Sequence, residues 1–244
     1  MISFEDVYLS RKEEISKFIQ MMRFIEQKEF EKDDEGKTAF DIFFCPTTGG
    51  IDLTYQELIN IFKSNLSLML YNIIEYTVAN LIDSIYDEIR MQNLSYIDVN
   101  DSIKQLWKKT ILKAVNDPNA NFNTFIKKND EIIDYIIERR TLSLNSRDSL
   151  PAGNLDGLKI KETFVNHGVQ VPSSSQYFRP DILENIKQNR NNLAHGTVSF
   201  VEAVQNDSIS DLESNAHIIV GFLDELIGTV KNYIETREYT VVIA

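Results

Sequence analysis

The chain has 244 residues, of which 43% are hydrophobic and 10% aromatic, and it carries a formal net charge of −12. This length and apolar content are enough for one domain with a substantial core, and nine glycines and five prolines argue against a long disordered linker. The negative charge excludes a surface that attracts nucleic acid as a whole, so any RNA site must be a local positive patch.

The first residues carry no targeting signal that we recognise. Met1 to Glu14 lack a basic stretch followed by an apolar core, so no signal peptide is predicted. The least charged window, Ser64 to Ile82, contains Glu75 and three asparagines and is too polar for a transmembrane helix. Cys45 is the only cysteine, so no intramolecular disulfide can form. We expect a cytoplasmic protein that does not cross a membrane.

The N-terminal part of the chain predicts one helix and one extended segment. Residues 5–29 place isoleucine, phenylalanine and methionine at helical spacing, which predicts an amphipathic helix. Residues 39–45 are short, apolar and followed by Pro46, which favours a strand. The tail, residues 239–243, is also rich in β-branched residues, and we expect it to pair with residues 39–45.

A long helix is predicted over residues 54–91, beginning with a capping box at Thr54. Residues 66–85 are apolar nearly all round, which predicts a central helix that its neighbours bury. Glu75 interrupts this apolar run. Because a buried carboxylate needs a partner, either Glu75 pairs with Arg190, or it faces solvent or an adjacent lysine.

Further helices are predicted in the second half of the chain. They span residues 102–115, 123–140, 158–166, 180–195 and 210–236. Asn100 or Asp98 can cap the first of these helices, and a second capping box at Ser210 opens the last. His167 follows the helix over residues 158–166, where its side chain can bind the last carbonyls. The sequence therefore predicts an all-α helical bundle as one domain, 1–244. Residues 1–53 form the N-terminal helix and extended segment, residues 54–237 form the core around one long central helix, and a minor two-stranded β element is the only sheet expected.

The run Asn189 to Gly196 puts an arginine and a histidine where the helical pattern requires neither. Arg190 lies three or four residues from apolar positions before and after it, so it falls on the apolar stripe of this helix and needs a partner. His195 lies about 7.5 Å further along the helix axis. Asn191 and His195 thus join Arg190 at the C-terminal end of one helix.

This run, Arg190-Asn191-x-x-x-His195, resembles the motif of the HEPN superfamily of helical ribonucleases. Its continuation through Leu193-Ala194-His195-Gly196 is similar to that of a prokaryotic defence branch labelled MAE-type, and the resemblance covers residues 54–237 in helix order. The resemblance implies a HEPN-like bundle in which Arg190, Asn191 and His195 are the catalytic residues of an endoribonuclease. It also implies a homodimer and a cognate antitoxin or sensor protein. Some relatives carry a tyrosine two positions after the histidine that a nucleotidyltransferase modifies, whereas this chain has Thr197.

The residue types suit cleavage of RNA without a metal ion. One group must take the proton of the attacking 2′-hydroxyl and another must protonate the leaving 5′-oxygen, and an imidazole titrates in the required range. A guanidinium binds the phosphoryl oxygens that gain charge. Glu75, Lys187 and Arg179 are candidate supporting residues, the last two as phosphate contacts. We expect no cofactor and no metal, because no nucleotide-binding glycine loop or metal-ligand spacing is present.

Alternative interpretations remain open at this point. Arg190 can instead form a buried ion pair while His195 caps the helix end. The chain can also be a non-catalytic helical module that binds RNA, a nucleotide or a partner protein, which its acidic balance favours. A third possibility is a structural or antitoxin-like subunit. The leading hypothesis is a toxin or anti-phage endoribonuclease that acts as a homodimer on single-stranded or tRNA-like RNA.

Overall fold

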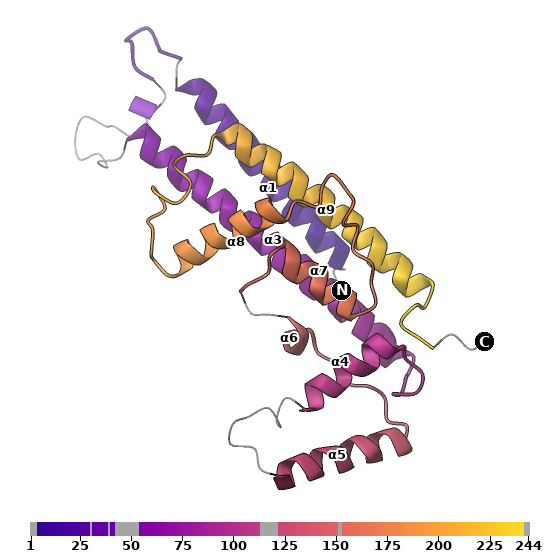
Figure 1. The fold of residues 1–244 in the computed structure, drawn as a ribbon. Helices are drawn as coiled ribbons and strands as arrows, with labels where there is room; N and C mark the ends of the chain where they lie inside the picture. The colour runs from indigo at the N-terminus through magenta and orange to yellow at the C-terminus, as the bar shows by residue number, and fades with distance from the viewer. Residues whose placement is uncertain are drawn as a thin grey trace. The chain divides into compact units, whose positions relative to one another are not determined.

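The computed structural model describes residues 4–29, 31–38, 40–41, 54–112, 122–150 and 153–241 (Figure 1). Its helices are α1 (Phe4–Lys28), α3 (Tyr55–Met91), α4 (Asp101–Leu112), α5 (Phe122–Ile137), α6 (Ser146–Ser149), α7 (Gly157–Asn166), α8 (Pro180–Ala194) and α9 (Ile209–Glu235). Within these ranges the only β contacts are isolated bridges, which join Lys32 to Thr38, Ser95 to Thr141 and Val99 to Thr240. The prediction of an all-α bundle with one long helix is confirmed.

The chain divides into two compact units. The first holds Met1–Glu75 and Arg179–Gly221, and the second holds Tyr76–Phe178 and Phe222–Ala244. The helices α3 and α9 each contribute one part of their length to either unit. The expectation of a single domain stays a prediction.

The first unit contains α1, α8 and the N-terminal parts of α3 and α9. The α1 helix buries Ile15, Ile19 and Met22, which recur at the spacing of one helical face. Two polar contacts join α1 to α9: the Tyr8 hydroxyl donates to the carbonyl of Val220 at 3.5 Å, and Arg23 pairs with Glu213 at 2.7 Å. The apolar face and these contacts fix α1 along α9.

The α3 helix begins as its capping box predicts. The backbone N–H of Thr54 donates to the Glu57 carboxylate at 2.7 Å, and the N–H of Glu57 donates to the Thr54 hydroxyl at 3.2 Å. The apolar residues of the helix are buried on more than one side, as expected of a central helix. They include Leu66, Leu70, Tyr71, Ile73, Ile74, Val78, Ile82, Ile85 and Ile89.

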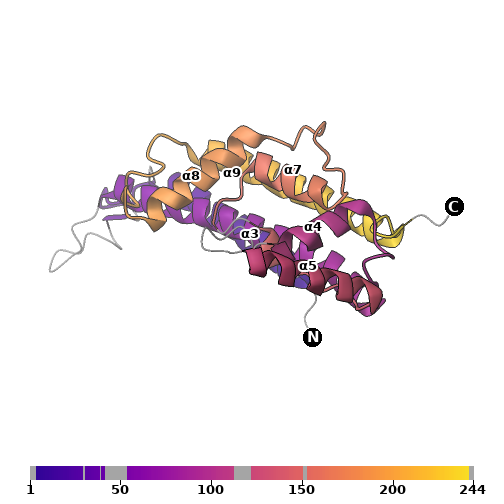
Figure 2. The same ribbon diagram turned by 60° about the horizontal axis from the view of Figure 1, so that its bottom comes forward.

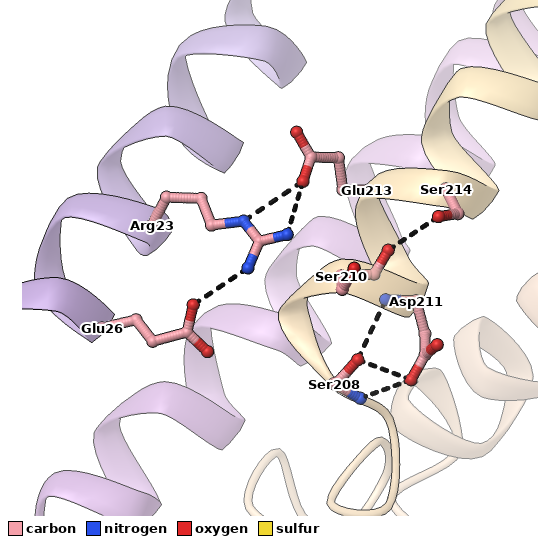
Figure 3. Close-up of polar contacts among 7 residues, drawn as sticks. All are labelled: Arg23, Glu26, Ser208, Ser210, Asp211, Glu213 and Ser214. Atoms are coloured by element: carbon pink, nitrogen blue, oxygen red, sulfur yellow. Dashed lines mark hydrogen bonds and ion pairs between the residues drawn. The ribbon is translucent and has the colours of Figure 1, made fainter.

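The α9 helix begins earlier than predicted, and the capping residues differ from those expected at Ser210 (Figure 3). The Ser208 hydroxyl donates to the Asp211 carboxylate at 2.6 Å, and the N–H of Asp211 donates back to the Ser208 hydroxyl at 3.0 Å. Glu213, which a capping box at Ser210 would require as its third residue, instead accepts from Arg23 of α1. In a capping box, an aspartate three residues after the serine can bind as a glutamate does. The sequence therefore could not distinguish a cap at Ser208 from one at Ser210.

The second unit contains α4 to α7 and the C-terminal parts of α3 and α9. Asn100 caps α4 by accepting from the N–H of Ile103 at 2.9 Å, as predicted. The helices α4 and α5 lie next to each other (Figures 1 and 2), and the ring centres of Trp107 on α4 and Tyr135 on α5 lie 4.9 Å apart, with the ring planes tilted by 49°. Trp107 is buried, and its ring also lies 5.4 Å from that of Tyr96.

The predicted β pairing is only partly within the described chain. Phe40 and Asp41 are helical, and the remainder of residues 39–45 and residues 242–243 lie outside the described ranges. Thr240 of the tail bridges Val99, with the N–H of Val241 donating to the carbonyl of Asp98 at 2.9 Å. In the ranges that the structure describes, no helix has the length and apolar character needed to cross a membrane.

Candidate functional site

The α8 helix carries the motif at its C-terminal end. Pro180 occupies the first turn, where its missing N–H costs no hydrogen bond. The helix ends because Gly196 adopts φ of +66°, a left-handed conformation that suits glycine. The N–H of Gly196 then donates to the carbonyl of Leu193 at 3.2 Å, and the N–H of Thr197 donates to the carbonyl of Asn192 at 3.0 Å. This closing turn makes His195 the last residue of the helical run.

Arg190 rests on an aromatic ring. Its guanidinium carbon lies 5.1 Å from the centre of the Tyr71 ring, and the Tyr71 side chain is fully buried in α3. One guanidinium nitrogen, Nη1, donates to the side-chain carbonyl of Asn191 at 3.0 Å. The favourable cation–π contact explains how a permanent charge is held on the apolar stripe of α8.

The ion pair considered between Arg190 and Glu75 is not formed. Glu75 is half-buried on α3, one helical turn beyond Tyr71, and makes no ion pair or hydrogen bond from its side chain to any described residue. Arg190 likewise has no carboxylate within ion-pair distance among the described residues. No such ion pair is therefore observed within the described chain, and four of the five N–H donors of the guanidinium have no acceptor there.

His195 presents its ring to solvent. Its backbone N–H donates to the carbonyl of Asn191 at 3.0 Å, but its side chain makes no hydrogen bond with any residue that the structure describes. The alternative that the ring caps the helix carbonyls is thus not observed. Five residues of helix separate the side-chain directions of Arg190 and His195 by about 140°. Within one chain the two groups leave α8 on different sides.

The two flanking cations are held by acidic neighbours. Lys187 binds Glu184 at 2.7 Å, and it lies one turn before Arg190 on the same helix. Arg179 binds Asp181 through two hydrogen bonds of 2.9 and 2.6 Å at the other end of α8. Eleven residues place Arg179 about 16 Å from Arg190 along the axis. The helix thus brings Lys187, but not Arg179, near the motif.

Tyr71 was not among the candidate residues that the sequence offered. Its signal was its spacing: Tyr71 and Glu75 are four residues apart and lie on one face of α3, so a residue that meets one can meet the other. The carboxylate was the electrostatic choice as a partner for Arg190. The structure places the guanidinium over the aromatic ring instead.

A second polar cluster lies in the second unit around His167. The ring Nδ1 faces the carbonyl of Thr163 at 2.7 Å, and because a carbonyl only accepts, Nδ1 carries the proton. The other nitrogen, Nε2, then accepts from the hydroxyl of Tyr86 at 2.6 Å, and Tyr86 accepts from Ser149 at 2.6 Å. Burial lowers the pKa of His167 to about 4 and raises the pKa of Tyr86 to about 12.

This cluster has a structural role. The carbonyl that His167 binds belongs to the last turn of α7, which confirms the prediction that His167 binds carbonyls at a helix end. The chain of hydrogen bonds from Ser149 to Tyr86 and His167 also joins α6 and α7 to α3. In the described chain, no group of three or more histidine, cysteine, aspartate or glutamate residues is close enough to hold a metal ion.

Comparison with known protein families agrees with the helical fold. A family model described as HEPN_MAE_28990-like HEPN matches residues 4–239. No curated protein matches the chain, and no solved structure matches it. The family match spans both the N-terminal helix and the bundle that follows, so it extends beyond residues 54–237, where the motif's resemblance was seen. The chain therefore belongs to the HEPN_MAE_28990-like family of the HEPN superfamily.

Proposed function

We propose that the protein is an endoribonuclease that binds a phosphodiester through Arg190 and transfers a proton through His195. One observation carries the proposal: among the described residues, a guanidinium fixed on a buried tyrosine ring has four N–H donors without an acceptor, and an exposed imidazole without a hydrogen-bond partner follows five residues later. The Arg190 charge is partly buried, and no described carboxylate neutralises it. We therefore expect it to bind an anion from outside the chain, such as a phosphate.

The nucleophile of the proposed reaction is the 2′-hydroxyl of the RNA itself. The 2′-oxygen attacks the adjacent phosphorus while a base takes its proton, the bond from phosphorus to the 5′-oxygen breaks, and an acid protonates that leaving oxygen. The products are a 2′,3′-cyclic phosphate and a 5′-hydroxyl end. Arg190 offers a planar fork to the phosphoryl oxygens, which gain negative charge in the transition state. Asn191 holds Nη1 of Arg190 and so orients the fork.

One histidine serves only one of the two proton transfers. The 140° that separates Arg190 and His195 on one helix also favours an arrangement in which the two groups acting on one phosphate come from different chains. We propose a two-fold homodimer in which each chain contributes both groups to a shared cleft. The exposure of His195 leaves it accessible to such a partner.

We place this activity in a toxin–antitoxin or anti-phage system, acting on single-stranded or tRNA-like RNA. Membership of the HEPN superfamily, together with the Arg190 and His195 motif, supports this proposal. A cognate antitoxin or sensor would restrain the enzyme. Because Thr197 stands where some relatives have a modifiable tyrosine, control by nucleotidyl transfer at that position is not part of the proposal.

The test compares His195→Ala with His217→Ala, since both remove an exposed histidine of the same unit. We expect His195→Ala to lower the cleavage rate of tRNA or single-stranded RNA by about 10²- to 10⁴-fold, and Arg190→Ala by about 10²- to 10³-fold. His217→Ala should cleave as the wild type does. Cleavage should persist in EDTA and leave 2′,3′-cyclic phosphate ends.

Thermal unfolding of each variant separates loss of chemistry from loss of fold. Wild-type cleavage by a folded His195→Ala protein would refute the assignment. If the wild type binds RNA with an affinity that depends on Arg190 but never cleaves it, the chain is a non-catalytic RNA-binding module instead.

A further inference from the structure

The α5 helix exposes an apolar stripe that no other described element of the chain buries. Its neighbour is α4 (Figures 1 and 2), which contacts the side around Tyr135, yet α5 has no buried residue. Four large side chains along the helix are strongly exposed: Phe122 by 74%, Ile126 by 43%, Ile133 by 53% and Ile137 by 73%. At 100° per residue these four fall within a sector of about 60°. A continuous apolar stripe of this kind marks a binding surface.

The stripe is symmetric about its own centre. Phe122 and Ile137 are equally far from the midpoint between Asn129 and Asp130, and so are Ile126 and Ile133. A two-fold axis through that midpoint, perpendicular to the helix, would place Phe122 of one copy against Ile137 of another. It would likewise place Ile126 against Ile133. The surface is therefore complementary to itself in the antiparallel sense.

We propose that α5 pairs with α5 of a second copy of this chain, antiparallel and in this register. The charges on one edge of the stripe support this partner. Lys127, Asp130 and Asp134 make no ion pair or side-chain hydrogen bond within the described chain. In the antiparallel register, Lys127 lies between Asp130 and Asp134 of the other copy, about 3 Å along the axis from each. The two-fold axis repeats this contact, so the two Lys127 side chains of the dimer lie near the four carboxylates of Asp130 and Asp134.

The other edge of the stripe is matched in the same way. There Phe125, exposed by 45%, falls between the positions of Ile132 and Ile136 of the other copy. Apolar side chains thus meet apolar side chains on this edge, while opposite charges meet on the first. An unrelated partner would have to reproduce both edges, whereas a second copy does so by symmetry.

The size of the stripe predicts a weak association. The five exposed apolar side chains would bury on the order of 1,000 Å² in total from both copies, which is at the lower limit for a specific interface. The proposed contact is separate from the catalytic cleft and does not rest on the nuclease proposal. If both contacts form, dimers joined at the motif would assemble further through α5.

A cysteine placed near the two-fold axis tests the register. In a full-length Cys45→Ser background, Asn129→Cys should form a disulfide between two copies, because the axis passes beside this position. The matched control is Asn123→Cys on the same helix. Its counterpart on the other copy lies 13 residues away along the axis, about 20 Å, beyond the reach of a disulfide. We expect the covalent dimer of Asn129→Cys to form at least about tenfold faster than that of the control.

Substitutions that exchange the signs of the paired charges test whether the partner of α5 is a second copy of this chain. Lys127→Glu should slow the Asn129→Cys crosslink, and adding Asp130→Lys with Asp134→Lys to it should restore the rate, since the exchanged pairs are again opposite in sign. Equal crosslinking at positions 129 and 123, or no rescue by the exchange, would overturn the proposal. Binding of the stripe to a different protein or to lipid vesicles, without crosslinking at position 129, would likewise overturn it.

Discussion

The buried imidazole of His167 should make the fold sensitive to acid in a defined range. The ring is 1% exposed, and its protonated form would lose the hydrogen bond that Nε2 accepts from Tyr86. Burial of the ring, which disfavours its charged form, lowers the pKa of His167 from 6.5 to about 4. Because the folded-state pKa lies below that of the unfolded chain, the neutral ring contributes stability at neutral pH. This contribution is lost as the pH falls from about 6.5 towards 4.

The size of the effect follows from the difference between the two pKa values. Between pH 8 and pH 5 the free energy of unfolding should fall by about 2 kcal/mol through His167, and by about 3 kcal/mol once the pH is well below 4. Carboxylates also respond to acid, so the change must be isolated with a variant. His167→Gln keeps a polar side chain that does not titrate, and it should lose the part of the pH dependence that His167 supplies.

Urea denaturation at pH 8, 6.5 and 5 measures this difference for the wild type and for His167→Gln. The control is His217→Gln, which removes an exposed histidine and should retain the wild-type pH dependence. Equal losses of stability in the wild type and in His167→Gln between pH 8 and pH 5 would refute the reasoning. Titration of the His167 ring by NMR provides a direct check, because a midpoint near 6.5 is incompatible with a buried neutral imidazole.

Two other substitutions test the elements that hold the motif. Tyr71→Phe keeps a ring beneath Arg190 and should retain most of the RNA cleavage. Tyr71→Leu removes a contact worth about 0.5–2 kcal/mol and should lower kcat/KM about 2- to 30-fold; equal rates for both variants would contradict this. At Gly196, φ is +66° and no atom lies within 4 Å of the place that a Cβ would take, so Gly196→Ala should cost about 1 kcal/mol through backbone strain alone, while Gly196→Asn should cost less. Thermal unfolding distinguishes these costs, and an unchanged melting temperature in Gly196→Ala would contradict the prediction.

The parts of the fold that local chemistry determines were predictable from the sequence. The Thr54 capping box and the helix cap at Asn100 each act within a few residues; the first was found where the sequence placed it, and the second is one of the two caps that the sequence offered. The start of α9 was missed because two serines offered equivalent caps, and in the structure Ser208 caps the helix while Glu213 binds Arg23 of α1. That contact joins residues 190 positions apart, so no local pattern contains it.

The surroundings of Arg190 were harder to predict for the same reason. The sequence shows that an arginine on an apolar stripe needs compensation, and it offered Glu75 as the charged partner. Which residue of α3 meets Arg190 depends on where α8 crosses that helix. A shift of one turn exchanges the carboxylate for the ring of Tyr71. The preference of a guanidinium for an aromatic face is a general rule, but applying it required the position of the crossing.

The turn that ends α8 at Gly196 leaves the two proposed active groups in different states of order. Arg190 has already lost much of its rotational freedom to Tyr71 and Asn191, whereas the ring of His195 can still rotate about its side-chain bonds. An incoming phosphate would thus meet a fork that is already oriented, and the imidazole would settle only afterwards. If the proposed activity holds, capture of RNA would precede assembly of the proton-transfer geometry, and a chain without its proposed partner would hold RNA while cutting it slowly.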